Sequence, residues 1–335
     1  MIMNSSKIIF IFVLMMSTLM TISANNWLGM WMGMEMNLMA FIPLISKSKN
    51  KNSSQAMMMY FLVQSIGSVT LLFSVTMNPL VMANLNFEEL WLKEMIMVSL
   101  AIKLGAAPFH WWLPNVMSNL NWPECLILMT WQKLAPLTVM NNLMSSPMMI
   151  TYMLITFSGM VGSFGGLNQT SVRKMLGYSS INHLGWMMSF MSMSDMWYKY
   201  LIIYSLLMSM ICYMLNHKNI YFLNQMMPSS NSMTEKFMLT IMMLSIGGLP
   251  PFIGFLPKWM AIQSMISSSL VPVMITMLVL SLVTLLYYLR MMINYMLMYS
   301  TMNKWMKFKS TNLCLLYITI SVNMLLPTFL TLNFF

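Results

Sequence analysis

Apolar runs long enough to cross a lipid bilayer recur along the whole chain, and they constrain its fold more than any other feature. The 335 residues are 59% hydrophobic and only 7% charged, a composition that is not typical of a soluble domain. Lipid offers exposed backbone no hydrogen-bond partner, so each crossing segment must be a helix whose backbone bonds are internal. The sequence therefore predicts an all-α, polytopic transmembrane helix bundle.

About eleven spans are expected, joined by short connections and without a linker that would separate two domains. We expect a single transmembrane domain over residues 1–335, with a first half over 1–144 and a second half over 145–335. The hydrophobic start, Ile8–Met20, has no small-residue cleavage site and is interpreted as a retained first span. The predicted spans are 5–23, 26–45, 56–77, 89–119, 124–144, 148–166, 172–192, 196–216, 236–267, 271–293 and 312–332.

Basic residues gather at those span ends that an eleven-span arrangement places on one face. By the positive-inside rule, this bias predicts an amino terminus on the cytoplasm-like face and a carboxyl terminus on the opposite face. The net charge of +10 follows from the same bias, so no nucleic-acid partner is expected. The basic residues on this face are Lys7, Lys47, Lys49, Lys51, Arg173, Lys174, Lys218, Lys236, Arg290, Lys304, Lys307 and Lys309.

Residues that hold metals or carry electrons are scarce. Cys125, Cys212 and Cys314 stand alone, and the chain has only three histidines, so we expect no iron–sulfur cluster or zinc site within it. The 51 methionines are spread evenly, which favours lipid-facing positions over a copper site. We therefore expect the chain itself to bind no cofactor and no metal.

Two of the long spans contain helix-breaking residues beside a lysine. Pro108 lacks a backbone donor and disfavours helix at Ala107, and Gly105 loosens the turn that follows Lys103. A second break, near 247–257, repeats the pattern of residues 108–114 as P-F-x-x-aromatic-L-P. Broken helices in corresponding parts of two halves are typical of transporters built from structural repeats. We expect such an antiporter-like repeat, which could be inverted, although Lys103 precedes its break and Lys258 follows the other.

Four charged residues lie too deep in the predicted spans to reach a membrane face: Glu35, Lys103, Lys133 and Lys258. A charge at that depth costs about 3 kcal/mol or more and is a functional hypothesis by default. Removal from water favours the neutral form of a lysine, whereas a nearby carboxylate favours the charged form. We expect Glu35 and Lys103 to form a coupled pair that holds or releases a proton, with Lys133 as a central relay and Lys258 as an exit-side or lateral relay.

Two histidines are candidate links in this relay, and each has a second interpretation. His110 lies beside Trp111 and Trp112, where packing or hydrogen bonding is the favoured role, and His183 has polar neighbours that leave both roles open. Lys133 and Lys258 could instead extend toward the membrane surface or form static ion pairs that hold helices together.

Four motifs occur in order along the chain: KLGAAPFHWWLP at 103–114, QKLAP at 132–136, SSINHLGW at 179–186 and GGLPPFIGFLPKW at 247–259. Through them the chain resembles the antiporter-like membrane subunits of respiratory complex I, in their mitochondrially encoded form, over essentially its whole length. The resemblance implies a proton-translocating subunit in the mitochondrial inner membrane. It places Glu35, Lys103, Lys133 and Lys258 at the acid and lysine positions of that family.

The resemblance also implies where the remaining chemistry takes place. NADH, flavin, iron–sulfur clusters and ubiquinone would be bound in or between partner subunits, and the partners would be other membrane-arm subunits and the lipid bilayer, with cardiolipin as a candidate lipid. The amino terminus would lie in the matrix and the carboxyl terminus toward the intermembrane space. Two alternatives stay open: a purely structural subunit of the same arm, and a free-standing secondary cation/proton antiporter.

Overall fold

The computed structural model describes residues 5–46, 51–82, 89–144, 149–193, 196–226, 233–267, 270–297 and 313–323. Within these ranges the regular structure is helical, and the strand-like pairing is a single isolated bridge between Ser171 and Phe222. The expected all-α class is confirmed. Several residues named above lie outside what the structure describes, as do both chain ends: Lys47, Lys49, Lys304, Lys307, Lys309 and the side chain of Cys314.

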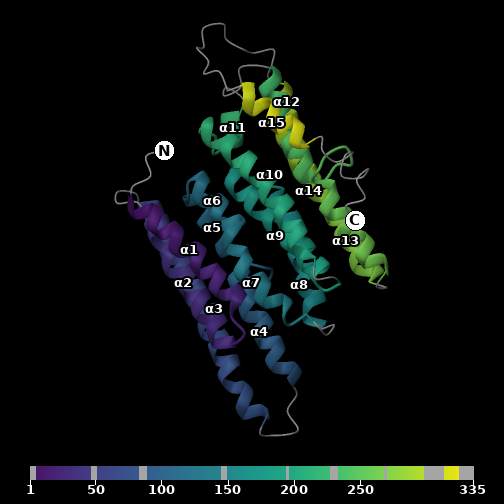
Figure 1. The fold of residues 1–335 in the computed structure, drawn as a ribbon. Helices are drawn as coiled ribbons and strands as arrows, with labels where there is room; N and C mark the ends of the chain where they lie inside the picture. Colours follow the sequence, from purple (N-terminus) through teal and green to yellow (C-terminus); the bar gives the residue numbers. More distant parts are fainter. Residues whose placement is uncertain are drawn as a thin grey trace. The chain divides into compact units, whose positions relative to one another are not determined.

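The chain forms two compact units, Met1–Ser158 and Gly159–Phe335. In the first unit α1 packs on α2, α3 packs on α2, α4 and α5, and α7 packs on α1, α2, α4 and α6 (Figure 1). The helices of this unit are α1 (Ser5–Ser23), α2 (Trp27–Ile45), α3 (Lys51–Met82), α4 (Glu89–Leu104), α5 (Trp112–Asn119), α6 (Trp122–Met129) and α7 (Trp131–Asn141), and α8 (Met149–Gly166) contains the boundary.

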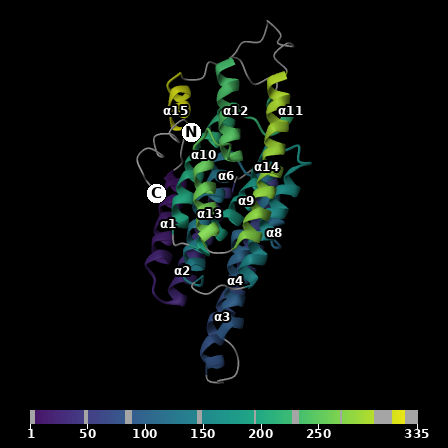
Figure 2. The same cartoon turned by 90° about the vertical axis from the view of Figure 1, so that its right-hand side faces the viewer.

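In the second unit, α9 packs against α10, α13 and α14, and α12 packs against α10, α14 and α15 (Figure 2). Almost every residue of α9 from Met175 to Met191 is buried. The helices of this unit are α9 (Val172–Met191), α10 (Trp197–His217), α11 (Leu223–Met226), α12 (Met233–Gly247), α13 (Phe255–Ser267), α14 (Val271–Leu297) and α15 (Leu313–Asn323). A single transmembrane domain with halves that meet at residue 144 stays a prediction.

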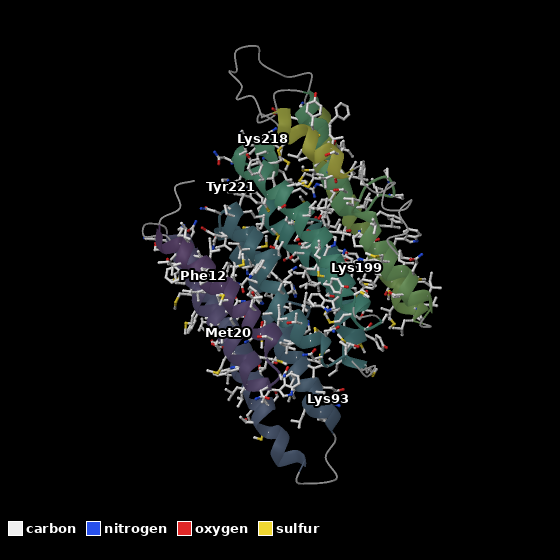
Figure 3. The ribbon with its side chains drawn as sticks, in the orientation of Figure 1. Phe12, Met20, Lys93, Lys199, Lys218 and Tyr221 are labelled. Atoms are coloured by element: carbon white, nitrogen blue, oxygen red, sulfur yellow. The ribbon has the colours of Figure 1, made fainter. Side chains whose placement is uncertain are left out.

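Six helices among the described residues are long and apolar enough to cross a membrane: α1, α2, α3, α8, α10 and α14. Their outer faces carry exposed apolar side chains, such as Phe12 and Met20 on α1 (Figure 3). Polar side chains on α1 bond to their own helix, as when the Thr21 hydroxyl donates to the Thr18 carbonyl at 2.7 Å. Such a surface suits lipid, because it leaves few polar groups to solvate. The count of eleven spans stays a prediction.

The helix expected over 124–144 is divided in two. α6 ends at Met129 and α7 begins at Trp131, because Thr130 has φ −116° and ψ −69°, away from regular helix. The Thr130 hydroxyl donates to the Leu126 carbonyl at 2.7 Å, and the Lys133 backbone N–H donates to the Thr130 carbonyl at 3.3 Å. Pro136 lies inside α7. The break therefore lies one turn or more before the proline.

Gly33 lets α2 approach α1 closely. A Cβ atom at this position would run into the Thr21 side chain and would lie 3.1 Å from the Ser17 carbonyl oxygen. Small residues at such contacts are what allow membrane helices to pack backbone to backbone.

We expect Gly33→Ala to destabilise the protein by about 1–3 kcal/mol through overpacking of this contact. The measurement is the thermal melting of the detergent-solubilised protein. Gly247→Ala is the control, since its Cβ would have 3.7 Å to the nearest side chain. Equal melting temperatures for the two variants would contradict the tight α1–α2 contact.

Candidate functional site

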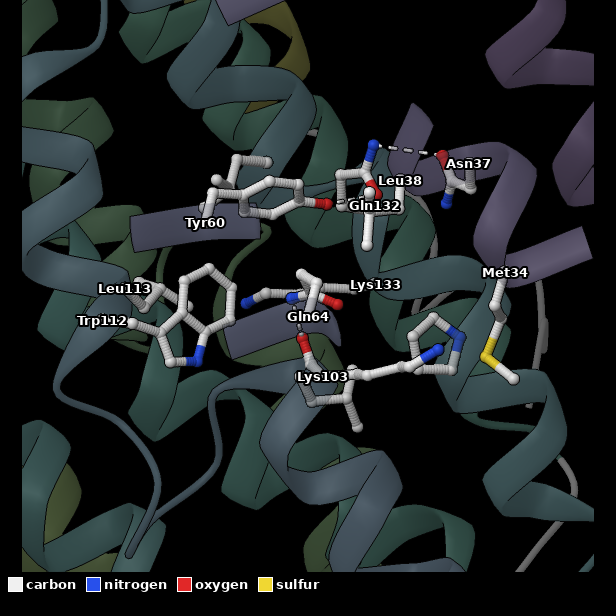
Figure 4. Close-up of a pocket in the computed structure, with 13 residues that line it drawn as sticks. Met34, Asn37, Leu38, Tyr60, Gln64, Lys103, Trp112, Leu113, Gln132 and Lys133 are labelled. Atoms are coloured by element: carbon white, nitrogen blue, oxygen red, sulfur yellow. Dashed lines mark hydrogen bonds between the residues drawn. The ribbon is translucent and has the colours of Figure 1, made fainter. Parts of the chain in front are cut away.

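The first unit encloses a small polar cavity that contains two of the expected lysines. Its volume open to water-sized molecules is ≈ 20 Å³, which is enough for about one water molecule. Helices α2 to α7 all contribute to its wall (Figure 4). The lining residues are Met34, Asn37, Leu38, Tyr60, Gln64, Lys103, Leu104, Trp112, Leu113, Leu128, Gln132, Lys133 and Pro136.

Lys103 reaches the cavity because α4 ends directly after it. Gly105 has φ +70°, its N–H donates to the Ile102 carbonyl at 3.2 Å, and the Ala106 N–H donates to the Ala101 carbonyl at 3.0 Å. These two bonds are the Schellman arrangement that satisfies the last carbonyls of a helix. The Trp112 indole adds a third donor, 3.2 Å from the Ile102 carbonyl. The helix is thus ended by Gly105, and Pro108 lies beyond the end rather than causing it.

Glu35 and Lys103 face one another, as the sequence predicted. Lys103 Nζ lies 3.9 Å from Glu35 Oε1, with the lysine side chain 3% exposed and the glutamate side chain 25% exposed. That distance is too long for a hydrogen bond, and Glu35 Oε1 makes none with the described residues. The stem of Lys103 packs on α3, where a Cβ at Gly67 would come within 2.9 Å of Lys103 Cγ. The lysine is held in place, and its carboxylate partner is loosely bound.

A chain of amide and hydroxyl groups joins the helices around the two lysines. Gln132 on α7 donates to Asn37 Oδ1 on α2 at 3.1 Å and accepts from the Tyr60 hydroxyl of α3 at 3.3 Å. Gln64 on α3 donates to the Lys103 carbonyl at 3.0 Å. Sequence reasoning did not assign these four residues. The sequence feature that could have pointed to them is a polar side chain inside an apolar span. Asn37 lies two residues after Glu35, and Gln132 lies directly before Lys133.

Lys133 lines the same cavity as Lys103 and is almost fully buried, with 2% exposure. It lies in the first turns of α7, directly after the interruption at Thr130. The structure therefore brings together three of the predicted residues, Glu35, Lys103 and Lys133, in one unit.

Lys258 lies in the second unit, where a very similar helix end surrounds it. Gly248 has φ +80°, and the N–H groups of Gly248 and Leu249 donate to the carbonyls of Ser245 and Leu244 at 2.9 and 3.3 Å. Lys258 is buried, and its Nζ donates to the Gly247 carbonyl at 2.7 Å. A Cβ at Gly248 would lie 2.7 Å from that ammonium, so glycine is needed both for its backbone and for its space.

The two histidines have different surroundings. His110 is partly exposed, with Nδ1 3.1 Å from the Pro108 carbonyl and its ring stacked on Trp111 at 5.4 Å, and it is not among the residues that line the cavity. His183 is buried in α9, with Nδ1 2.9 Å from the Tyr200 hydroxyl.

Three further charged side chains near predicted span ends are buried. Glu124 closes a capping box on α6, where its Oε2 accepts from the Asn121 N–H at 3.1 Å. Glu235 and Lys236 lie in the first turn of α12, and Glu235 accepts from Lys218 at 2.9 Å. Figure 3 labels Lys218 and Tyr221 near each other in this region. The described residues contain no group of three His, Cys, Asp or Glu that could hold a metal ion.

Comparison with known proteins gives consistent matches over nearly the whole chain. The family model described as NADH:quinone oxidoreductase/Mrp antiporter, TM, matches residues 24–284. The chain is 42% identical to NADH-ubiquinone oxidoreductase chain 2 of Locusta migratoria over 310 residues, which covers 90% of this chain and 89% of the relative. It is 38% identical to the protein of the same name from Hylobates lar over 284 residues, which covers 82% of this chain and 81% of the relative.

Solved structures show the same fold. A chain of respiratory complex I from Thermus thermophilus superposes with a TM-score of 0.84 at 20% identity, over 97% of this chain and 78% of that chain. A chain of the Mrp complex from Dietzia sp. superposes with a TM-score of 0.72 at 14% identity, over 84% of this chain and 59% of the other.

Replacement of Gln132 by leucine tests the amide and hydroxyl network. We expect Gln132→Leu to destabilise the protein by about 1–3 kcal/mol, because Asn37 and Tyr60 each lose a partner in a buried site. The exposed Gln55 on α3 supplies the control Gln55→Leu, which should leave the melting temperature almost unchanged. If the two variants melt together, the network does not stabilise the fold.

Proposed function

We propose that this chain, which belongs to the NADH:quinone oxidoreductase/Mrp antiporter transmembrane family, moves protons as a membrane-arm subunit of a respiratory NADH:ubiquinone oxidoreductase. It is a multi-pass protein of the mitochondrial inner membrane, in line with relatives named as chain 2 of that enzyme. The single observation that carries the mechanism is one buried cavity that contains Lys103 and Lys133, with Glu35 only 3.9 Å from Lys103.

The mechanism is a charge switch between Glu35 and Lys103. Two unit charges about 4 Å apart interact by roughly 4 kcal/mol at an effective dielectric constant near 20, and the partial exposure of Glu35 reduces this value. With the carboxylate close, Lys103 keeps its proton. When Glu35 moves away, no hydrogen bond has to break, the buried lysine favours its neutral form, and its proton can pass through the cavity to Lys133.

The second unit would continue the relay through Lys258, with His183 as a further candidate. The bond from Lys258 to the Gly247 carbonyl places the lysine ammonium at the carboxyl end of α12, where helix carbonyls favour a cation. His110 remains a weaker candidate, since it does not line the cavity that contains Lys103 and Lys133.

Electron transfer is assigned to partner subunits. Cysteines and histidines are few in this sequence, and NADH, flavin, iron–sulfur clusters and ubiquinone would be bound in or between the partners. Energy would reach this chain as a displacement of Glu35 relative to Lys103, driven from a neighbouring membrane-arm subunit. The bilayer, with cardiolipin as a candidate lipid, would cover the apolar outer faces.

The finer architecture is also proposed. Helices α4 and α5, and likewise α12 and α13, would each be one interrupted span in a bundle of about eleven, and the two interrupted spans would be equivalent parts of a repeat. Support comes from the glycine-terminated helix ends at Gly105 and Gly248, which use the same pair of hydrogen bonds. The amino terminus would lie in the matrix and the carboxyl terminus toward the intermembrane space.

Two other functions can be distinguished from that of a proton-moving subunit. A purely structural subunit would hold its lysines in static contacts, and the 2.7 Å bond of Lys258 to a backbone carbonyl is an observation that would suit it. A free-standing cation/proton antiporter would fold and exchange ions in vesicles without partners, which a subunit would not do.

The decisive variant is Lys133→Met, which keeps the length of the side chain and deletes its charge. In assembled enzyme we expect the protons pumped per NADH oxidised to fall markedly, because the central relay can no longer accept a proton. Lys51→Met, on the exposed first turn of α3, is the matched control and should pump normally. Unchanged pumping in Lys133→Met would favour the structural subunit.

Glu35→Gln tests the switch itself. Removal of the carboxylate takes away the group that holds the proton on Lys103, so we expect slower coupled turnover with normal assembly. The control is Glu94→Gln, on the preceding part of α4 and outside the cavity. Coupled proton transport equal to that of the control would rule out the Glu35–Lys103 pair as the switch.

A further inference from the structure

The first unit has a second hollow, on its outer surface, which the proposed relay does not use. It is a groove between α3 and the connection from α4 to α5, and ≈ 520 Å³ of it is open to water-sized molecules. That volume lies within the range of sites that enclose small molecules, about 300–1,000 Å³. Among the described residues that line the groove, Asn115 is the one polar side chain beside aliphatic and aromatic ones.

The groove follows α3 for about 10 Å, which is the helical rise over residues 59–66. At the far end of this stretch, a Cβ at Gly67 would lie 3.4 Å from the Ile102 side chain of α4. Two turns nearer to the start of α3, the ring of Tyr60 lies 5.8 Å from the ring of Trp112 on α5. The chain therefore runs from Ile102 to Trp112 in the direction of the amino end of α3.

The polar residue of the groove lies at one end of it. Asn115 follows Trp112 by one turn of α5, so it lies at the end nearer to the start of α3. In the interrupted span proposed above, it is about 6 Å from the carboxyl end of α5. The interfacial layer beside the hydrocarbon core of a bilayer has a similar thickness. In that placement, the groove opens near the level of the lipid ester groups, and its lining becomes aliphatic and aromatic toward the middle of the membrane.

The α3 side of the groove belongs to the outer apolar face of that helix. Leu62 and Ile66 line the groove with 53% and 56% exposure, and the exposed face continues to Val69. Across the groove, Trp111 is 72% exposed. A lipid chain can thus enter from the side. A neighbouring helix fits less well, because packed helices fill one another's holes with single side chains, and a hollow of this size would keep voids that forfeit contacts.

A single side chain separates the groove from the lysine cavity. Trp112 lines both hollows, and Figure 4 shows its ring on the cavity wall beside that of Tyr60. Its indole N–H donates to the Ile102 carbonyl at 3.2 Å, and a Cβ at Gly105 would lie 3.2 Å from its ring. Water in the groove would therefore lie one indole ring away from the cavity, whereas a hydrocarbon chain keeps that side of the wall dry.

We propose that this groove binds one acyl chain of a membrane phospholipid, with the ester group at Asn115 and the end of the chain between Ile66 and Ile102. The side-chain amide of Asn115 can donate to an ester carbonyl, and the aliphatic and aromatic walls match a hydrocarbon chain. The bound chain forms the outer layer of the wall that Trp112 gives the lysine cavity. The proposal rests on the membrane placement in the proposed function and does not depend on proton transfer.

The test is photolabelling of the assembled enzyme in phosphatidylcholine vesicles, in which a small fraction of the lipid carries a diazirine on one acyl chain. Labelled peptides are mapped by mass spectrometry. We expect residues 59–66 to be labelled about fivefold or more above Val69 and Phe73, which are equally exposed on the same helix but lie outside the groove. Ile66→Trp fills the groove and should lower its labelling to the level of those two residues. Ile275→Trp is the matched control, at an isoleucine of α14 with 52% exposure, and should leave the labelling of the groove unchanged.

Equal labelling inside and outside the groove would overturn the proposal, because it would show ordinary contact with the bilayer. Weaker labelling inside the groove would also overturn it, because a helix of a partner subunit would then cover the site. Both comparisons use the unaltered enzyme, so they decide even if Ile66→Trp does not assemble. In either case label on Val69 and Phe73 leaves the proposed function standing, whereas the absence of label from every exposed apolar face would contradict the membrane placement itself.

Discussion

The two lysine sites depend on how a helix can end inside a packed helix bundle. The last carbonyls of a helix need donors, and lipid supplies none. Gly105 and Gly248 solve this problem through a left-handed backbone that directs two N–H groups back onto α4 and α12. Once the carbonyls are satisfied, the ends of these helices can be buried. The negative end of each helix dipole then lies beside a lysine, Lys103 in one case and Lys258 in the other.

The two sites differ in what holds the ammonium group. Lys258 has a short bond to a backbone carbonyl, whereas Lys103 has a carboxylate at 3.9 Å and no direct hydrogen bond to it. A pair that is attracted by charge but not joined by a hydrogen bond can separate at low cost, which is what the proposed switch between Glu35 and Lys103 needs. The amides of Gln64 and Gln132 join the helices that surround the pair.

Much of the architecture followed from the apolar runs. Helix α1 has the predicted bounds, α2 and α8 begin within one residue of theirs, and α9 ends within one, because lipid leaves a run of that length no other regular structure. The turn at Thr130 could not be predicted in this way, since threonine is neither glycine nor proline. The burial of Glu124, Glu235 and Lys236 could not be predicted either. A charge near a span end is expected to be solvated, and the sequence does not show whether another helix covers it.

The sequence by itself determined the helical class, and it predicted two interruptions beside lysines and a short list of deep charges from the cost of polar groups in lipid. Apart from the Glu35–Lys103 pair, which the sequence predicted, only the tertiary structure decided which of those groups meet. Glu35 and Lys103 lie on separate helices, Tyr60 and Gln132 on two more, and Trp112 comes from a fifth. Their distances depend on how the helices rotate and pack, which is set by close contacts such as Gly33 on Thr21 and Gly67 on Lys103, and no single apolar run contains that information.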